Sequence, residues 1–240
     1  MMKRPAAAKK KRSASTIRWI RNILIGCFIG SLLPVIIFRF VPVPVTPLMI
    51  IRCAQQIFND ETVTVKKEWV PLEEISPNMA CAVIASEDQN FTRHFGFDFK
   101  SIRKAYDKRN VRLRGASTIT MQTAKNLFLW PDRSWIRKGL EAYFTVLLET
   151  LWSKERILEV YLNVAEMGKG IYGVEAAANA YFKKQAAGLT RNEAAMIAAS
   201  LPRPLKMSPA RPTAYMISRQ AWILRQMRFV SETSLDLRCL

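Results

Sequence analysis

The sequence predicts a mainly α-helical protein that follows a single N-terminal membrane helix. Residues 17–40 form an apolar run long enough to cross a bilayer, and several later tracts combine helical periodicity with N-cap signals. Only residues 62–70 show the apolar–polar alternation of a strand. With 240 residues, the chain can bury one ordinary core in addition to the membrane segment.

The formal net charge of +18 is concentrated partly at the N-terminus. Eight basic residues lie in the first 21 positions: Lys3, Arg4, Lys9, Lys10, Lys11, Arg12, Arg18 and Arg21. A basic flank directly before an apolar run is typical of the cytoplasmic side of a membrane helix. We therefore expect residues 1–16 to be a cytoplasmic basic tail without regular structure. Because the rest of the chain carries no nucleic-acid motif, we expect no nucleic acid as a partner.

Residues 17–40 are predicted to be an uncleaved transmembrane helix. Its core, residues 23–38, contains no charged side chain, and Pro34 is tolerable in such a helix. The alternative is a cleaved signal peptide, which requires a shorter apolar segment and small residues at the cleavage site. Residues 38–44 are instead bulky and proline-rich, so we favour the anchor and place everything beyond about residue 40 outside the membrane.

Residues 41–60 are expected to form a linker and a juxtamembrane helix, the helix running over residues 48–58. Three prolines between positions 42 and 47 exclude a helix at the start of this segment. Residues 61–230 then form the main folded domain, and residues 231–240 form a tail. Further helices are predicted from Pro77 after a Ser76 N-cap, and over residues 138–163, 170–182, 191–201 and 213–230. Thr190 and Glu193 form a capping box before the helix at 191–201.

The four cysteines, Cys27, Cys53, Cys81 and Cys239, contain no C-x-x-C pair and no metal-ligand spacing. A disulfide framework is not expected, and Cys81 is interpreted as a small apolar residue of a core helix.

The densest chemical signal lies between Ala80 and Gly96. An apolar, alanine-rich segment ends in two adjacent acids, Glu87 and Asp88, and a histidine follows at position 94. Apolar packing on one side and a polar loop on the other can hold a carboxylate rigidly at the wall of a cleft. Alternatively, the acids are solvated at a helix C-terminus and His94 caps its carbonyls.

A second signal is a set of cations downstream of a small, hydroxyl-rich turn at residues 115–118. This turn opens a helix whose exposed N–H groups favour an anion, and Lys125 adds a charge. Arg133, Arg137 and Lys138 follow, with Glu141 placed one helical turn after Arg137. Residues 97–114 mix apolar and basic side chains, which fits a surface resting on a bilayer and equally a solvated helix.

These segments resemble the motifs of the peptidoglycan glycosyltransferases, glycosyltransferase family 51. Residues 87–96 resemble E-D-x-x-F-x-x-H-x-G, 115–126 resemble G-x-S-T-x-x-Q-Q followed by K-N, 137–141 resemble R-K-x-x-E, and 154–163 resemble K-x-x-I-L-x-x-Y-L-N. The resemblance extends over about residues 65–210. One departure is plain, because Met121 stands where the family usually has the first glutamine of its pair.

The resemblance implies a lysozyme-like, two-lobed glycosyltransferase domain with a smaller membrane-facing lobe around residues 97–114. It implies polymerisation of lipid II: the acceptor 4-hydroxyl attacks the growing chain linked to lipid pyrophosphate, with inversion. Glu87 is then the expected base and Glu141 the second acid. The expected substrate-binding residues are Lys125, Arg133, Arg137, Lys138, Ser117, Thr118, Gln122 and Asn126. The expected supporting residues are Asp88, Phe91, His94 and Gly96.

The same resemblance implies further expectations about setting and partners. No protein-bound metal is expected, with a divalent cation, Mg or Mn, as an optional companion of the diphosphate. The expected location is the bacterial inner membrane, with the catalytic domain in the periplasm. The expected partners are lipid II, the lipid-linked growing glycan chain, the membrane, and proteins of cell division or elongation. Only about 30 residues follow Pro209, so no transpeptidase domain is expected.

Two alternatives remain open. One is a lysozyme-like lytic glycan hydrolase, because a glutamate in a cleft also serves glycoside cleavage. The other is a non-catalytic membrane scaffold that binds lipids or partners through its basic and aromatic surface. The cations favour the transferase, since a hydrolase of a neutral glycan link has no diphosphate to bind.

Overall fold

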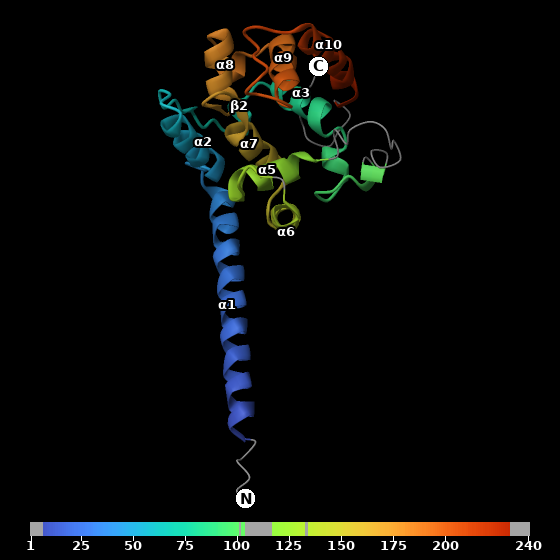
Figure 1. Cartoon of the computed structure of the whole chain (residues 1–240). Coiled ribbons are helices and arrows are strands. Elements are labelled where there is room, and N and C mark those ends of the chain that lie inside the picture. The colour runs from blue at the N-terminus through green and yellow to red at the C-terminus, as the bar shows by residue number, and fades with distance from the viewer. Residues whose placement is uncertain (1–6, 101, 104–116, 133, 231–240) are drawn as a thin grey trace, which may run out of the picture. The chain divides into compact units, whose positions relative to one another are not determined.

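The structure is a computed structural model that describes residues 7–100, 102–103, 117–132 and 134–230. It divides into two compact units, one ending at Val41 and the other beginning at Pro42. The described residues are mainly helical, as predicted (Figure 1). The predicted smaller lobe around residues 97–114 lies largely outside the described residues and stays a prediction.

The first unit is one helix, α1 (Ala7–Phe40). Its stretch Thr16–Phe40 has a mean hydropathy of 2.3 and is long and apolar enough to cross a membrane. The expectation of an irregular tail up to residue 16 is wrong in part, because the helix begins at Ala7. Alanine, lysine and arginine are among the strongest helix formers, so the basic segment continues the helix without a break.

The second unit begins with a segment that is fixed to the domain rather than free. Helix α2 (Pro47–Phe58) is capped by Thr46, whose side chain accepts a hydrogen bond from the Met49 N–H. Before it, the Val43 carbonyl accepts a hydrogen bond of 2.6 Å from Lys67 Nζ. Arg52 of α2 pairs with Glu166 through two hydrogen bonds, of 3.0 and 3.2 Å. The helix predicted over residues 48–58 is confirmed, because α2 covers these residues.

Helices α3 (Pro77–Glu87), α9 (Arg191–Ser200) and α10 (Ala214–Val230) lie together at one end of this unit (Figure 1). The side chains from Met79 to Ala85 are all buried, and each fully buried large aliphatic residue contributes roughly 1.5–3 kcal/mol. The Thr190–Glu193 capping box is present as predicted. Ser76 does not cap α3 through its side chain, because its hydroxyl donates to the Leu189 carbonyl at 2.8 Å.

Cys81 is buried within α3 and is disulfide-bonded. The prediction that Cys81 lies buried in a core helix is confirmed, whereas its disulfide bond was not expected. Cys27 and Cys53 are free thiols.

The helix predicted over residues 138–163 is two helices, α6 (Trp135–Leu151) and α7 (Lys154–Val164). The two helices are separate because Ser153 is the N-cap of α7. Its side chain accepts a hydrogen bond from the Arg156 N–H. Helix α5 (Ile119–Phe128) precedes them and is capped by Thr118. Together, α5, α6 and α7 carry most of the predicted polar residues.

A small sheet accompanies the helices, with β1 (Lys66–Lys67), β3 (Ile171–Tyr172) and β2 (Glu166–Gly168) in that spatial order. β1 pairs with β3 in parallel, and β2 pairs with β3 antiparallel. The strand predicted over residues 62–70 is thus limited to two residues, since β3 offers only two partners. The tract at 170–182 likewise opens as β3 before helix α8 (Val174–Phe182). Short 3-10 helices occur at η1 (Leu72–Glu74), η2 (Phe91–Arg93) and η3 (Ala186–Gly188).

Candidate active site

Glu87 is the last residue of α3, and its carboxylate is held on both oxygens. Oε1 accepts a hydrogen bond of 3.0 Å from the Ser86 hydroxyl, and Oε2 accepts one of 3.0 Å from Gln122 Nε2 on α5. The side chain is only partly exposed. An ionised carboxylate offers about four acceptor positions, so two remain free for a substrate hydroxyl.

Tyr161 of α7 fixes the direction of the bond from Gln122 to Glu87. Its side chain is 1% exposed, and burial, followed by the charge of Glu87, raises the pKa of Tyr161 well above its usual range. The phenol therefore stays protonated and donates to Gln122 Oε1 at 3.3 Å. With its oxygen engaged in this way, Gln122 must present its amide N–H to Glu87.

Asp88 and His94 hold the loop that follows Glu87. Asp88 accepts hydrogen bonds from His94 Nε2, at 2.9 and 3.0 Å to its two oxygens, and from the Ile119 N–H at 3.0 Å. A carboxylate at the start of α5 also interacts favourably with the positive end of that helix. These contacts support the positioning roles expected for Asp88 and His94.

Gly96 and Phe91 complete the same loop. Gly96 has φ of +75°, and a Cβ there would lie 2.6 Å from Thr145 Cγ2, so both conformation and space require glycine. Its carbonyl accepts a 2.6 Å hydrogen bond from the Thr118 hydroxyl. Phe91 is fully buried. The supporting residues expected from the sequence thus join the end of α3 to the start of α5.

Lys125 lies one turn after Gln122 on α5, so the two side chains emerge on the same face of that helix. Burial lowers the pKa of Lys125, while the charge of Glu141 acts in the opposite direction and Arg137 and Lys138 add to the lowering. A desolvated cation binds an anion more strongly than a cation in water. Lys125 is therefore placed to attract negative charge one turn after the glutamine that binds Glu87.

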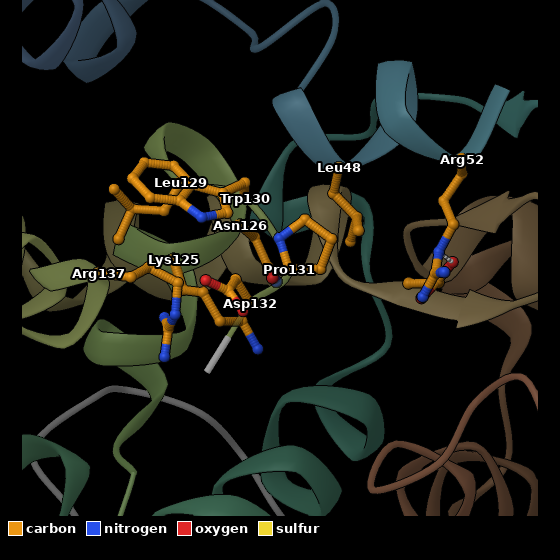
Figure 2. A pocket seen from close by; sticks show the side chains of 10 residues that line it. Leu48, Arg52, Lys125, Asn126, Leu129, Trp130, Pro131, Asp132 and Arg137 are labelled. Carbon is orange, nitrogen blue, oxygen red and sulfur yellow. Dashed lines mark hydrogen bonds and ion pairs between the residues drawn. The ribbon is translucent and has the colours of Figure 1, made fainter. Parts of the chain in front are cut away.

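A cavity of about 430 Å³ opens beside Lys125 (Figure 2). Its charged and polar lining includes Lys125, Asn126, Asp132 and Arg137, and its apolar lining includes Leu129, Trp130 and Pro131. Leu48 and Arg52 of α2 form the opposite wall. Helix α2 therefore contributes directly to the cavity that Lys125 and Arg137 line. Such a lining suits an amphiphilic ligand with an anionic group and an apolar part.

Glu141 is 3% exposed and carries two cationic partners from its own helix. Arg137 Nη1 donates to Oε2 at 2.6 Å, and Lys138 Nζ donates to Oε1 at 2.5 Å. Both oxygens are thus engaged by protein cations. The pairing of Arg137 with Glu141 is more buried than an ordinary surface pair, and it fixes the position of the guanidinium at the cavity.

The remaining predicted residues differ in how they are placed. Thr118 is buried at the start of α5 and Asn126 lines the cavity, whereas Ser117 is exposed. Arg133 lies outside the described residues, so its predicted role stays a prediction. Met121 is 5% exposed and does not line the cavity, so its side chain replaces the family's usual glutamine at a packed position.

A polar network missed by the sequence predictions supports the site from α6. Glu149 accepts hydrogen bonds from the Thr120 hydroxyl, at 2.5 Å, and from Lys154 Nζ, at 2.7 Å. Lys154 Nζ also lies 4.6 Å from the centre of the Phe91 ring. Lys154 belongs to the fourth motif and Tyr161 does too, so that motif offered a signal for both residues, whereas nothing local marked Glu149.

Comparison with known proteins identifies the family of the chain. The family model described as Transglycosylase matches residues 54–228, which include every described polar residue of the site except Arg52 of α2. The chain belongs to this transglycosylase family. Among similar transglycosylases is the biosynthetic peptidoglycan transglycosylase of Bdellovibrio bacteriovorus, 53% identical over 88% of this chain and 85% of that protein.

Two further transglycosylases with the same description show the breadth of the match. That of Bacteroides thetaiotaomicron is 52% identical over 95% of this chain and 91% of its own length. That of Pseudomonas entomophila is 50% identical over 89% of this chain and 92% of its own length. The family predicted from the four motifs is confirmed.

Proposed function

We propose that this chain polymerises lipid II into glycan strands, with Glu87 as the base and the cations of α5 and α6 receiving the leaving diphosphate. The coarser statement, that the chain is a peptidoglycan glycosyltransferase, is confirmed by the family and by the relatives described above. The observation that carries the finer proposal is that Gln122 of α5 holds the Glu87 carboxylate while Lys125, a desolvated cation, lies one turn further along the same helix.

In the proposed reaction, the 4-hydroxyl of the acceptor lipid II attacks the anomeric carbon of the growing chain. A new C–O bond forms as the bond to the diphosphate breaks, and the electron pair leaves with the diphosphate oxygen. Glu87 takes the hydroxyl proton, because an alcohol is a weak nucleophile at neutral pH. Attack from the face opposite the leaving group inverts the anomeric centre.

Negative charge accumulates on the departing diphosphate, and Lys125, Arg137 and Lys138 meet it. Glu141 keeps Arg137 and Lys138 in place through its two hydrogen bonds and does not itself transfer a proton. The apolar part of the cavity suits the first units of the lipid chain. Trp135 and Ile136, 92% and 77% exposed, precede these cations on α6 and suit contact with lipid.

We propose that the protein itself holds no metal ion. Both oxygens of Glu141 are engaged by cations, and the described part of the chain contains no group of three or more His, Cys, Asp or Glu suited to an ion. We propose that any Mg²⁺ or Mn²⁺ that takes part arrives bound to the diphosphate. No step of the proposed reaction depends on it.

Polymerisation of purified lipid II by the full-length protein tests the function. We expect glycan polymer and released lipid diphosphate from lipid II, and no soluble fragments from finished sacculi incubated in parallel. Fragments from sacculi with lipid II untouched would instead indicate the hydrolase. Consumption of neither substrate would leave the membrane scaffold as the better interpretation.

We further propose that α1 spans the inner membrane with its N-terminus in the cytoplasm and the catalytic domain in the periplasm. The basic flank before the apolar stretch supports this orientation, and a disulfide at Cys81 suits an oxidising compartment. Protease added to spheroplasts should degrade the catalytic domain and leave an N-terminal fragment. A domain that becomes cleavable only after the membrane is lysed would reverse the proposed orientation.

A further inference from the structure

Arg219 of α10 contacts the residue that directly precedes the proposed base. One terminal nitrogen, Nη2, donates to the Ser86 carbonyl at 3.0 Å and lies 3.4 Å from the Ser86 hydroxyl oxygen. That hydroxyl donates to Glu87 Oε1 at 3.0 Å. A chain from guanidinium to hydroxyl to carboxylate therefore connects the C-terminal helix to Glu87.

The end of α3 is an unfavourable place for an ionised acid. The C-terminal end of a helix carries a partial negative charge, and Glu87 is the last residue of α3, followed directly by Asp88. The Ile84 carbonyl accepts from the Asp88 N–H, and the Ala85 carbonyl accepts from Gln89 Nε2. Arg219 donates a hydrogen bond to the Ser86 carbonyl and brings a positive charge to this end. That charge offsets the partial negative charge of the helix end and the repulsion between the two adjacent acids.

The same contact fixes how Ser86 uses its single proton. A guanidinium only donates hydrogen bonds, so the Ser86 oxygen faces a donor on the Arg219 side. The hydroxyl proton must then point to Glu87. Tyr161 acts in the same sense on the other side, where its phenol turns Gln122 so that the amide N–H faces Glu87.

Arg219 is itself held in place. Its guanidinium carbon lies 4.3 Å from the centre of the Trp222 ring, one turn further along α10. Its Nε is buried without a hydrogen-bond partner, so the head group is held from Nη2 and from the ring rather than along its whole edge. A substitution at position 219 that removes the Nη2 contact therefore leaves little else to hold the new side chain near Ser86.

We propose that Arg219 is a positioning residue for the glycosyl transfer, acting through Ser86 to orient the Glu87 carboxylate. This inference rests on the proposed function of Glu87 as the base. It assigns a role in the reaction to α10, which lies after the last of the four motifs.

The test is steady-state polymerisation of lipid II by the full-length protein and its Arg219→Gln, Arg219→Lys and Ser86→Ala variants. Arg219→Gln should lower kcat by about ten- to a hundredfold, because small displacements of a reacting group cost this much, while KM changes by less than about threefold. Arg219→Lys keeps a cation at the helix end and should recover part of the loss. Arg225→Gln, an exposed change on the same helix, should leave the rate unchanged.

The double variant Ser86→Ala, Arg219→Gln separates positioning from simple packing. If Arg219 acts through the Ser86 hydroxyl, which itself donates to Glu87, the double variant should be no slower than Ser86→Ala alone, because coupled residues are not additive. Additive losses, or a loss of kcat that follows a matching loss of thermal stability without rescue by lysine, would overturn the inference. An unchanged kcat in Arg219→Gln would overturn it as well. If the wild type itself fails to polymerise lipid II, it is the proposed function that fails.

Discussion

Replacing Glu87 with glutamine should lower the rate of lipid II polymerisation by about 10²- to 10⁴-fold, the usual contribution of a general base. Glutamine has nearly the same shape but cannot accept the hydroxyl proton. It also disturbs the local pattern, because the Ser86 hydroxyl and the Gln122 amide both donate to this position. A single turnover assay with bound donor measures the chemical step directly.

The variant should remain folded, since one altered hydrogen bond costs about 1 kcal/mol. Thermal unfolding checks this point. Glu155→Gln provides a matched control, because Glu155 is an exposed glutamate in the first turn of α7. Polymerisation by Glu87→Gln within about threefold of the wild type would refute the assignment of Glu87 as the base and favour a different acid.

The fold was predictable wherever the signal was local. The capping box at Thr190 and Glu193 lies within four residues, and it marked the start of α9 correctly. The break at Ser153 was missed, because serine is tolerated inside a helix as well as at an N-cap and only its hydrogen bond decides. The length of β1 was also missed, because a strand extends only as far as its partner and β3 is distant in sequence.

The residues of the candidate site likewise divide into those that a local motif marks and those that only the fold brings together. Glu87, Lys125, Arg137 and Glu141 stand in short motifs whose residue types report their chemistry. Contacts between residues far apart in the sequence gave no such signal. The Arg52–Glu166 pair joins residues 114 positions apart, and the Arg219–Ser86 contact joins residues 133 positions apart. An isolated arginine on a helix reads as a solvated side chain until the fold brings its partner to it.

Replacing Lys125 with methionine should lower kcat/KM for lipid II by about 10²- to 10³-fold, the range for loss of one preorganised group that stabilises developing charge. Methionine keeps much of the length and apolar volume of the lysine stem, so the cavity wall is preserved. Lys125→Arg keeps the charge and should retain most of the activity. Lys169→Met is a control, because Lys169 is an exposed lysine paired with Glu61 away from the cavity.

The pH dependence of these variants distinguishes a binding cation from a packing residue. Burial lowers the pKa of Lys125, so its proton is lost below the usual lysine value of about 10.4. The kcat/KM of the wild type should then fall as the pH rises through this lowered pKa. Arginine remains charged in this range, so Lys125→Arg should move the alkaline limit to higher pH.

Stability should change in the opposite direction over the same window. Between the lowered pKa of Lys125 in the folded protein and about 10.4 in the unfolded chain, the unfolded chain binds more protons. The free energy of unfolding therefore gains from Lys125 as the pH rises, just where activity is lost, and Lys125→Met should lack this gain. An alkaline limit of kcat/KM that is the same in the wild type and in Lys125→Arg would show that another group sets it. In that case the stabilisation of the leaving diphosphate does not depend on the charge of Lys125.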